Sequence, residues 1–119
     1  MDAKERGKWG EAIALTYLKS KNYTEVATGF RSRFGEIDII VKDSEFVVFV
    51  EVKTRKNSGF AYAREYVGKA KQNKILATAN LWLVTHRTRL QPRFDVIEIY
   101  APLGVETRSP EIIHIENAF

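Results

Sequence analysis

The sequence predicts a single α/β domain built on a mixed five-stranded sheet flanked by helices. Two segments with helical periodicity alternate with strand-like segments in the order helix, three strands, helix, two strands. The 119 residues are 45% hydrophobic and 29% charged, as is ordinary for a domain able to bury its own core. No repeat and no shift in composition marks a boundary, so one domain over residues 1–119 is expected.

Composition limits the classes of function. The absence of cysteine excludes disulfides and thiolate metal sites. No apolar run approaches the length of a membrane span, and the first residues lack the apolar core of a signal peptide. We therefore expect a cytoplasmic protein with no membrane partner. A net charge of +4 and a pI near 9.4 weakly favour an anionic partner, most commonly nucleic acid.

The first helix is expected from Asp2 to about Lys19, with Asp2 opening a capping box. Glu11 falls in line with the apolar stripe that should face the sheet. It either points inward or lies solvated at the edge of that stripe. Gly7 and Gly10 are costly inside a helix, and close packing on a sheet or a substrate would explain them.

A first strand is expected over Tyr23–Phe30, and a hairpin of two strands rich in valine and isoleucine over residues 35–55. The turn of the hairpin lies near Asp43 and Ser44, and its loop has either two or four residues. Loop length sets the register, and therefore which side chains of the two strands lie opposite one another.

The hairpin carries charges on a face that should be buried. Alternation places Glu36 and Asp38 on one face of the first strand, and Glu51 and Lys53 on the same face of the second. Unpaired charges buried there would cost several kcal/mol each, so a metal ion is one candidate for compensation. The shorter loop places Glu36 opposite Glu51, and a shift by two residues places Asp38 there. The residues alone leave this choice open.

A mobile loop is expected between the hairpin and the second helix. Aromatic residues are interspersed with basic ones in this loop. They are Arg55, Lys56, Phe60, Tyr62, Arg64 and Tyr66. Such a mixture suits a polyanion whose bases can stack, and the loop starts beside the acidic cluster. A solvated loop whose tyrosines anchor in the core is an equally good interpretation.

The second helix is expected from about Tyr66 to Leu83. Apolar positions and one amide recur on one face, at Gln72, Ile75, Leu76, Ala79 and Leu83. Lys69 extends this face, so Lys69 and Gln72 should face the sheet near the helix start, where backbone N–H groups favour anions. Lys71 and Lys74 lie off the face, as phosphate contacts or solubilising charges.

Two further strands complete the expected sheet, over Arg93–Tyr100 and Ile112–Ile115. His86 and His114 are far apart in the sequence and match no ligand spacing. We interpret both as structural or surface residues.

The shared face of Asp38, Glu51 and Lys53 is the candidate active site. Carboxylates select a hard cation such as Mg²⁺ or Mn²⁺ and leave positions for water and phosphate oxygens. The backbone carbonyl of Val52 could add a ligand. Lys53 would stabilise the charge developing at phosphorus, or help to orient and deprotonate the attacking water. This set of residues predicts a phosphodiester hydrolase.

Four segments carry a family resemblance: GKWGEAIALTYL, GEIDII, VFVEVKTR and RFDVIEI. They resemble the YraN-like family of small bacterial proteins and, more broadly, the restriction-endonuclease-like nuclease superfamily, to which archaeal Holliday-junction resolvases are related. The resemblance implies a restriction-endonuclease-like sheet with Asp38, Glu51 and Lys53 at the catalytic positions and Glu11 as an acid carried by a helix.

The resemblance also implies an auxiliary position on the second helix, occupied by Lys69 or Gln72. Because resolvases of similar fold act as dimers, a homodimer is expected by analogy. The choice of Asp38 over Glu36 as the partner of Glu51 rests on the resemblance and not on geometry.

Three functional interpretations remain open from the sequence. The first is a metal-dependent DNA endonuclease, selective for branched or junction DNA, with Mg²⁺ or Mn²⁺ bound by Asp38, Glu51 and Val52. The second is a non-catalytic module that binds nucleic acid on the same scaffold. The third is a buried ion-pair network of purely structural value. The residues expected to contact nucleic acid are Arg33, Arg55, Lys69 and Gln72.

Overall fold

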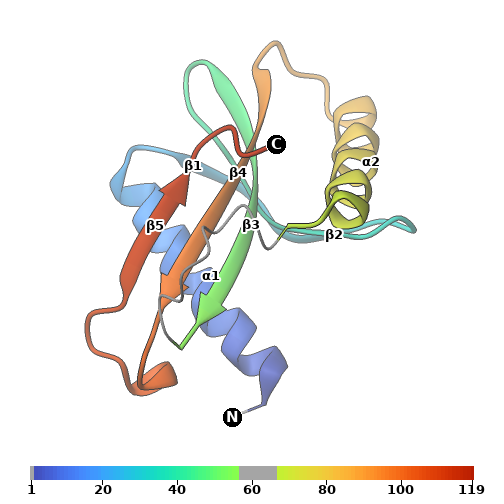
Figure 1. The fold of residues 1–119 in the computed structure, drawn as a ribbon. Coiled ribbons are helices and arrows are strands. Elements are labelled where there is room, and N and C mark those ends of the chain that lie inside the picture. Colours follow the sequence, from blue (N-terminus) through green and yellow to red (C-terminus); the bar gives the residue numbers. More distant parts are fainter. Residues whose placement is uncertain (1, 57–66) are drawn as a thin grey trace.

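The computed structural model describes residues 2–56 and 67–119, and these ranges contain a five-stranded sheet with helices on opposite faces (Figure 1). The elements in chain order are α1 (Ala3–Ser20), β1 (Thr24–Arg31), β2 (Glu36–Lys42), β3 (Phe46–Arg55), α2 (Lys69–Thr85), β4 (Gln91–Tyr100), the 3-10 helix η2 (Gly104–Glu106) and β5 (Glu111–Ile115). Strands lie side by side in chain order; β3 and β4 are parallel and the other neighbours antiparallel. The expected class and order of elements are confirmed.

The part of the expected loop that holds Phe60, Tyr62, Arg64 and Tyr66 lies outside the described residues. Neither α1 nor α2, the two α-helices within the described ranges, is long and apolar enough to cross a membrane.

Helix α1 begins as its capping residue predicts. The Asp2 carboxylate accepts a hydrogen bond of 2.8 Å from the backbone N–H of Glu5. Just beyond the other end, Asn22 adopts a φ of 71°, the left-handed conformation that often terminates helices. A Cβ on Gly10 would overlap Oγ1 of Thr54 in β3. Close packing of this helix on the sheet, expected from its glycines, is therefore confirmed.

The core forms two layers, one on each face of the sheet. The layer against α1 contains Ile39, Val41, Val48, Val50, Ile97 and Ile99. The layer against α2 contains Ile37, Ile40, Val47, Phe49 and Val96. The hairpin strands are thus covered on both sides, which explains why they are almost continuously apolar before their charged ends.

The hairpin has the longer of the two expected loops. Lys42 pairs with Val47, which leaves residues 43–46 in the loop. Asp43 holds this loop, because its Oδ1 accepts backbone hydrogen bonds at 2.8 Å and 2.7 Å from the two residues before Val47. The pairing ends at Ile39 and Val50, and the next residues on the two strands are Asp38 and Glu51, whose charges act on each other.

The buried face of α2 matches the expected one in part. Ile75 and Ala79 are buried as expected, and Leu76 and Leu83 are half-buried. Thr78 and Trp82 are buried as well, which the sequence did not predict. Trp82 packs edge-on against Phe49 with ring centroids 5.7 Å apart and stacks on His86 at 4.5 Å, so this large ring widens the buried face beyond the predicted residues.

Thr78 tolerates burial because its hydroxyl is satisfied. Its Oγ1 donates to the Lys74 carbonyl and lies 2.8 Å from Oγ of Ser32. The expectation for the start of the helix is also corrected. Lys71 lies toward the acidic residues of the sheet, in place of Lys69 and Gln72.

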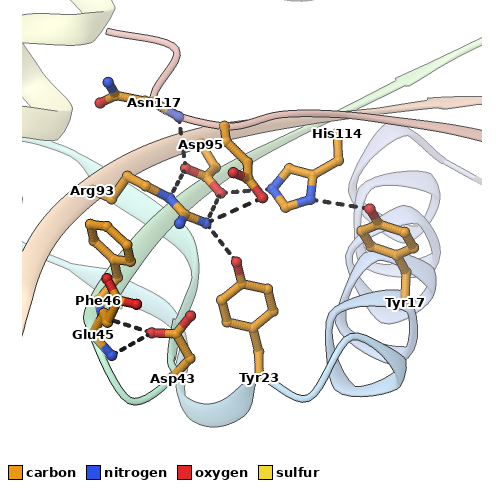
Figure 2. A network of polar contacts seen from close by, with 10 residues as sticks. Tyr17, Tyr23, Asp43, Glu45, Phe46, Arg93, Asp95, His114 and Asn117 are labelled. Atoms are coloured by element: carbon orange, nitrogen blue, oxygen red, sulfur yellow. Dashed lines mark hydrogen bonds and ion pairs between the residues drawn. The ribbon is translucent and has the colours of Figure 1, made fainter.

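A second group of buried charges joins β4, β5, α1 and the C-terminal tail (Figure 2). Asp95 is fully buried and accepts bonds of 2.9 Å and 2.8 Å from the Arg93 guanidinium and 3.1 Å from the N–H of Asn117. Nε2 of His114 lies 2.7 Å from Asp95, and its Nδ1 lies 3.2 Å from the Tyr17 hydroxyl. The structural role expected for His114 is confirmed.

Candidate functional site

The candidate site forms where β2 and β3 separate. The last backbone pair of the hairpin joins Ile39 and Val50. Asp38 directly precedes Ile39 in β2. Its Oδ2 accepts a 2.8 Å hydrogen bond from the N–H of Val52, which thus bonds to a side chain and not to a backbone carbonyl. Because the N–H and C=O of one strand residue face the same neighbouring strand, the Val52 carbonyl faces the same gap.

Asp38 and Glu51 lie close enough to repel each other. The pKa of Asp38 is raised from 3.8 to about 7, first by burial and second by the negative charge of Glu51. The Val52 N–H and the Lys71 ammonium oppose this shift only in part. Glu51 itself is only 5% exposed. A cation held between the two carboxylates would relieve this repulsion.

Glu11 approaches the same site from α1. It is half-buried and lines a cavity of about 400 Å³ together with Asp38, Glu51 and Lys53. Burial raises the pKa of Glu11, and the charges of Glu36 and Glu51 raise it further. Of the two sequence interpretations of Glu11, the structure supports the inward one. The four residues expected to be catalytic thus line one cavity.

Two lysines contact the same oxygen of Glu51. Lys53 Nζ lies 3.6 Å from Glu51 Oε1, and Lys71 Nζ lies 2.5 Å from it. Burial lowers the pKa of Lys53, and the neighbouring Lys71 lowers it further. Burial alone would lower the pKa of Lys71, but its contact with Glu51 raises the pKa above the usual value. Both ammonium groups partly neutralise the carboxylates.

The sequence predicts Lys71 as a phosphate contact or a solubilising charge off the sheet-facing side of the helix, and its contact with Glu51 was not expected. A signal for this contact exists in the sequence, because Lys71, Ile75, Thr78 and Trp82 follow each other at helical spacing along one line. The neighbouring line is richer in leucine and therefore gives the stronger prediction of a buried face.

Arg55 lines the cavity, but its guanidinium contacts a buried acid. Its Nε lies 3.0 Å from Oε1 of Glu98, which is fully buried in β4. Two further cations line the same wall: Lys56, which belongs to the basic loop expected beside the acidic cluster, and Arg6, which was not expected from the sequence. The cavity is therefore lined by both acidic and basic side chains, a combination that suits a metal ion together with a phosphate group.

The other three residues expected to contact nucleic acid do not line the two cavities that contain Asp38 and Glu51. Arg33 is exposed, and its guanidinium stacks over the Phe34 ring at 4.8 Å. Lys69 is exposed at the start of α2. The side-chain amide of Gln72 donates to the Val67 carbonyl at 2.8 Å, so this residue fixes the helix start.

The oxygen donors at the gap fit a hard divalent cation. They comprise the carboxylates of Asp38 and Glu51 and the carbonyl of Val52. Within residues 2–56 and 67–119, no three acidic or histidine side chains converge as a cage for a metal. Mg²⁺ is usually held by one or two carboxylates with water and phosphate oxygens, and not by a complete protein cage. The donor set therefore suits Mg²⁺ or Mn²⁺.

The metal-free protein should lose stability as the pH rises. Because the pKa of Asp38 is raised to about 7, the folded state holds this proton more tightly than the unfolded chain. The contribution of Asp38 is therefore full below its unfolded pKa of about 4 and is lost as the pH rises through 7. The size of this pKa shift also depends on the charged groups that face Asp38, which are Glu51, Glu11 and Lys71.

Thermal unfolding in a metal chelator checks this prediction. Between about pH 5.5 and pH 8, the melting temperature of the wild type should fall more steeply than that of Asp38→Asn. Parallel curves for the two proteins would show that Asp38 does not titrate in this range.

The fold and the site together define a small mixed α/β protein with a carboxylate and lysine cluster at one end of its sheet. A family model described as "Uncharacterised protein family UPF0102" matches residues 10–99, which include Glu11, Asp38, Glu51, Lys53 and Lys71. The chain belongs to the UPF0102 family, which is the YraN-like family that its motifs resemble.

Similar proteins cover nearly the whole chain. A UPF0102 protein of Geotalea daltonii is 44% identical over 119 residues, which are 99% of this chain and 91% of the relative. A UPF0102 protein of Acetivibrio thermocellus is 43% identical over 116 residues, which are 95% of this chain and 89% of the relative. A UPF0102 protein of Clostridioides difficile is 42% identical over 120 residues, and the alignment covers 100% of this chain and 100% of the relative.

Proposed function

We propose that this protein is a metal-dependent endonuclease that hydrolyses phosphodiester bonds in DNA, with branched or junction DNA as its preferred substrate. The observation that carries the proposal is the meeting of Asp38 and Glu51 at the gap between β2 and β3, beside the backbone of Val52. Two carboxylates held against their own repulsion lower stability, and such costs are typical of functional sites.

The residues around the acidic pair have distinct roles in this proposal. Asp38, Glu51 and the Val52 carbonyl would hold Mg²⁺ or Mn²⁺. When bound, such an ion polarises a phosphate oxygen and makes water more acidic. Lys53 presents an ammonium group for charge developing at the phosphate. Glu11, with its raised pKa, can hold or release a proton at the cavity wall.

The basic side chains of the cavity support a polyanionic substrate. Its cations are Arg6, Lys53, Arg55, Lys56 and Lys71. DNA in preference to RNA, the choice of branched substrates and a homodimer in the cytoplasm are parts of the proposal that rest on the nuclease resemblance. A two-fold assembly would suit a branched duplex because it presents equivalent sites to two strands.

A non-catalytic nucleic-acid-binding module is the second candidate. The observation that favours it is the 2.5 Å contact of the Lys71 ammonium with Glu51. This ion pair already compensates part of the acidic charge without a metal. In a binding module the pair would be permanent, and the cavity would present only its basic residues to phosphate groups.

Cleavage assays with defined substrates test the proposal. Labelled duplex, single-stranded, flap and four-way DNA, with RNA of the same sequence, are incubated with Mg²⁺, Mn²⁺ or a chelator. We expect internal cleavage that requires the metal and is fastest on a branched substrate. Salt-dependent binding without cleavage in either metal would favour the binding module.

A further inference from the structure

Two ammonium groups already approach the Glu51 carboxylate. Lys71 and Lys53 lie 2.5 Å and 3.6 Å from its Oε1. The same carboxylate is assigned to the metal in the proposed function, on which this inference rests. A divalent ion bound to Glu51 would repel both ammonium groups, because like charges interact strongly at such short distances in a partly buried site. We therefore expect one ammonium group to move away when a metal binds.

Lys71 is better placed to leave than Lys53. The Lys71 side chain is 46% exposed, against 22% for Lys53. Lys71 extends from the first turn of α2, whereas Lys53 belongs to β3, between two neighbouring strands. A long and half-exposed side chain regains water contact and rotamer freedom when its ion pair breaks, so its displacement costs little.

The released side chain would remain near the acids. Lys71 lines both cavities that flank Asp38 and Glu51, so its ammonium can move along the shared wall. Lys74, one turn further along α2, lines the second of these cavities. Displacement of Lys71 toward Lys74 would bring two positive charges together, at a position suited to a phosphate group.

We propose that Lys71 acts as a displaceable counter-cation: it neutralises Glu51 in the metal-free protein, gives way to the divalent metal, and then binds a phosphate of the substrate. Metal and DNA binding are consequently coupled. The metal releases Lys71 for the phosphate, and the phosphate in turn keeps Lys71 away from the metal site, so each ligand tightens the binding of the other.

Metal affinity of charge-removing variants tests the proposal. In calorimetric titrations with Mn²⁺, Lys71→Met should bind about 3- to 5-fold more tightly than the wild type, because the metal no longer has to break an ion pair worth about 1 kcal/mol or less. Lys74→Met is the matched control, since it removes the same charge from the same helix and should change affinity less than about 2-fold. Lys71→Arg keeps the charge and should bind as the wild type does.

Chemical labelling provides a second readout. Lysine acetylation by acetic anhydride at constant pH is followed by mass spectrometry of peptides. Saturating Mn²⁺ should increase the labelling rate of Lys71 several-fold, because its ion pair is broken, and leave unchanged that of exposed Lys42, at the turn end of the hairpin.

The possible outcomes separate this inference from the proposed function. If the wild type binds Mn²⁺ and Glu51→Gln does not, but Lys71→Met binds no more tightly and Lys71 labelling does not rise, the counter-cation is refuted and the metal site stands. If the wild type binds Mn²⁺ no better than Glu51→Gln, the metal site and the counter-cation both fail. Melting curves of all variants ensure that only folded proteins are compared.

Discussion

Glu51→Gln is expected to lower the rate of metal-dependent DNA cleavage on the order of 10²- to 10³-fold, the usual effect of removing one preorganised electrostatic group. The substitution keeps the shape of the side chain but removes a charge assigned to metal binding. It also removes the repulsion that raises the pKa of Asp38. The lost ion pair with half-exposed Lys71 is worth about 1 kcal/mol or less, so the fold should stay intact.

Initial cleavage rates at several metal concentrations, with melting curves in parallel, check this prediction. The matched control is Glu25→Gln, which removes an exposed acid from the neighbouring strand β1. Glu25 lies 3.0 Å from Lys19 and pairs with Val41, toward the end of β2 that is opposite to Asp38. Cleavage by Glu25→Gln should stay within about 3-fold of the wild type, because a screened surface charge acts weakly at this range.

Two results would contradict the catalytic assignment of Glu51. Unchanged cleavage in Glu51→Gln would remove this residue from the reaction. A loss of several kcal/mol of folding stability in Glu51→Gln, with no protection of the wild type by metal, would instead identify a structural ion-pair network.

Asp95→Ala should have the largest effect on stability. It would leave the buried Arg93 without its main partner and remove the acceptor of His114 and of the Asn117 N–H. Breaking a buried ion pair from one side costs about 3 to 5 kcal/mol. For a domain of this size such a loss lowers the melting temperature by more than about 10 °C. Calorimetric or circular-dichroism melting measures it.

Glu116→Gln is the control for this network. Glu116 is 61% exposed and lies 3.9 Å from the same Arg93 guanidinium, so its removal should cost less than about 1 kcal/mol. Equal losses in Asp95→Ala and Glu116→Gln would show that burial of Asp95 does not determine the effect.

The buried carboxylate of Asp95 should also make the folded state less stable at low pH. Burial alone would raise the pKa of Asp95, but hydrogen bonds from His114, Arg93 and the Asn117 N–H hold it below its usual value. Its stabilising contribution is therefore present above the ordinary carboxyl pKa and is lost as the pH falls through the lowered one. This direction is opposite to that of Asp38, so the metal-free protein should be most stable in weak acid.

Periodicity was sufficient to predict the secondary structure. Alternation of apolar residues identified the strands, and the capping residue Asp2 located the start of the first helix. These signals are local, because they arise from backbone geometry and burial within single elements. The buried face of α2 was predicted only in part: Ile75 and Ala79 are buried as expected, but Trp82 and Thr78 are buried through contacts with distant residues, Phe49 and Ser32.

The sequence by itself determined the class of fold and the kinds of residue at the candidate site: acids and a lysine on one face of a buried hairpin, with Glu11 aligned toward it. Only the tertiary structure decided that Asp38 meets Glu51, because two loop lengths were compatible with the same alternation and hydrogen bonds of the folded turn selected one. It likewise brought Lys71 to Glu51. The rotation of a helix depends on the total fit of its side chains against the sheet, and that energy is not written in any single segment of the chain.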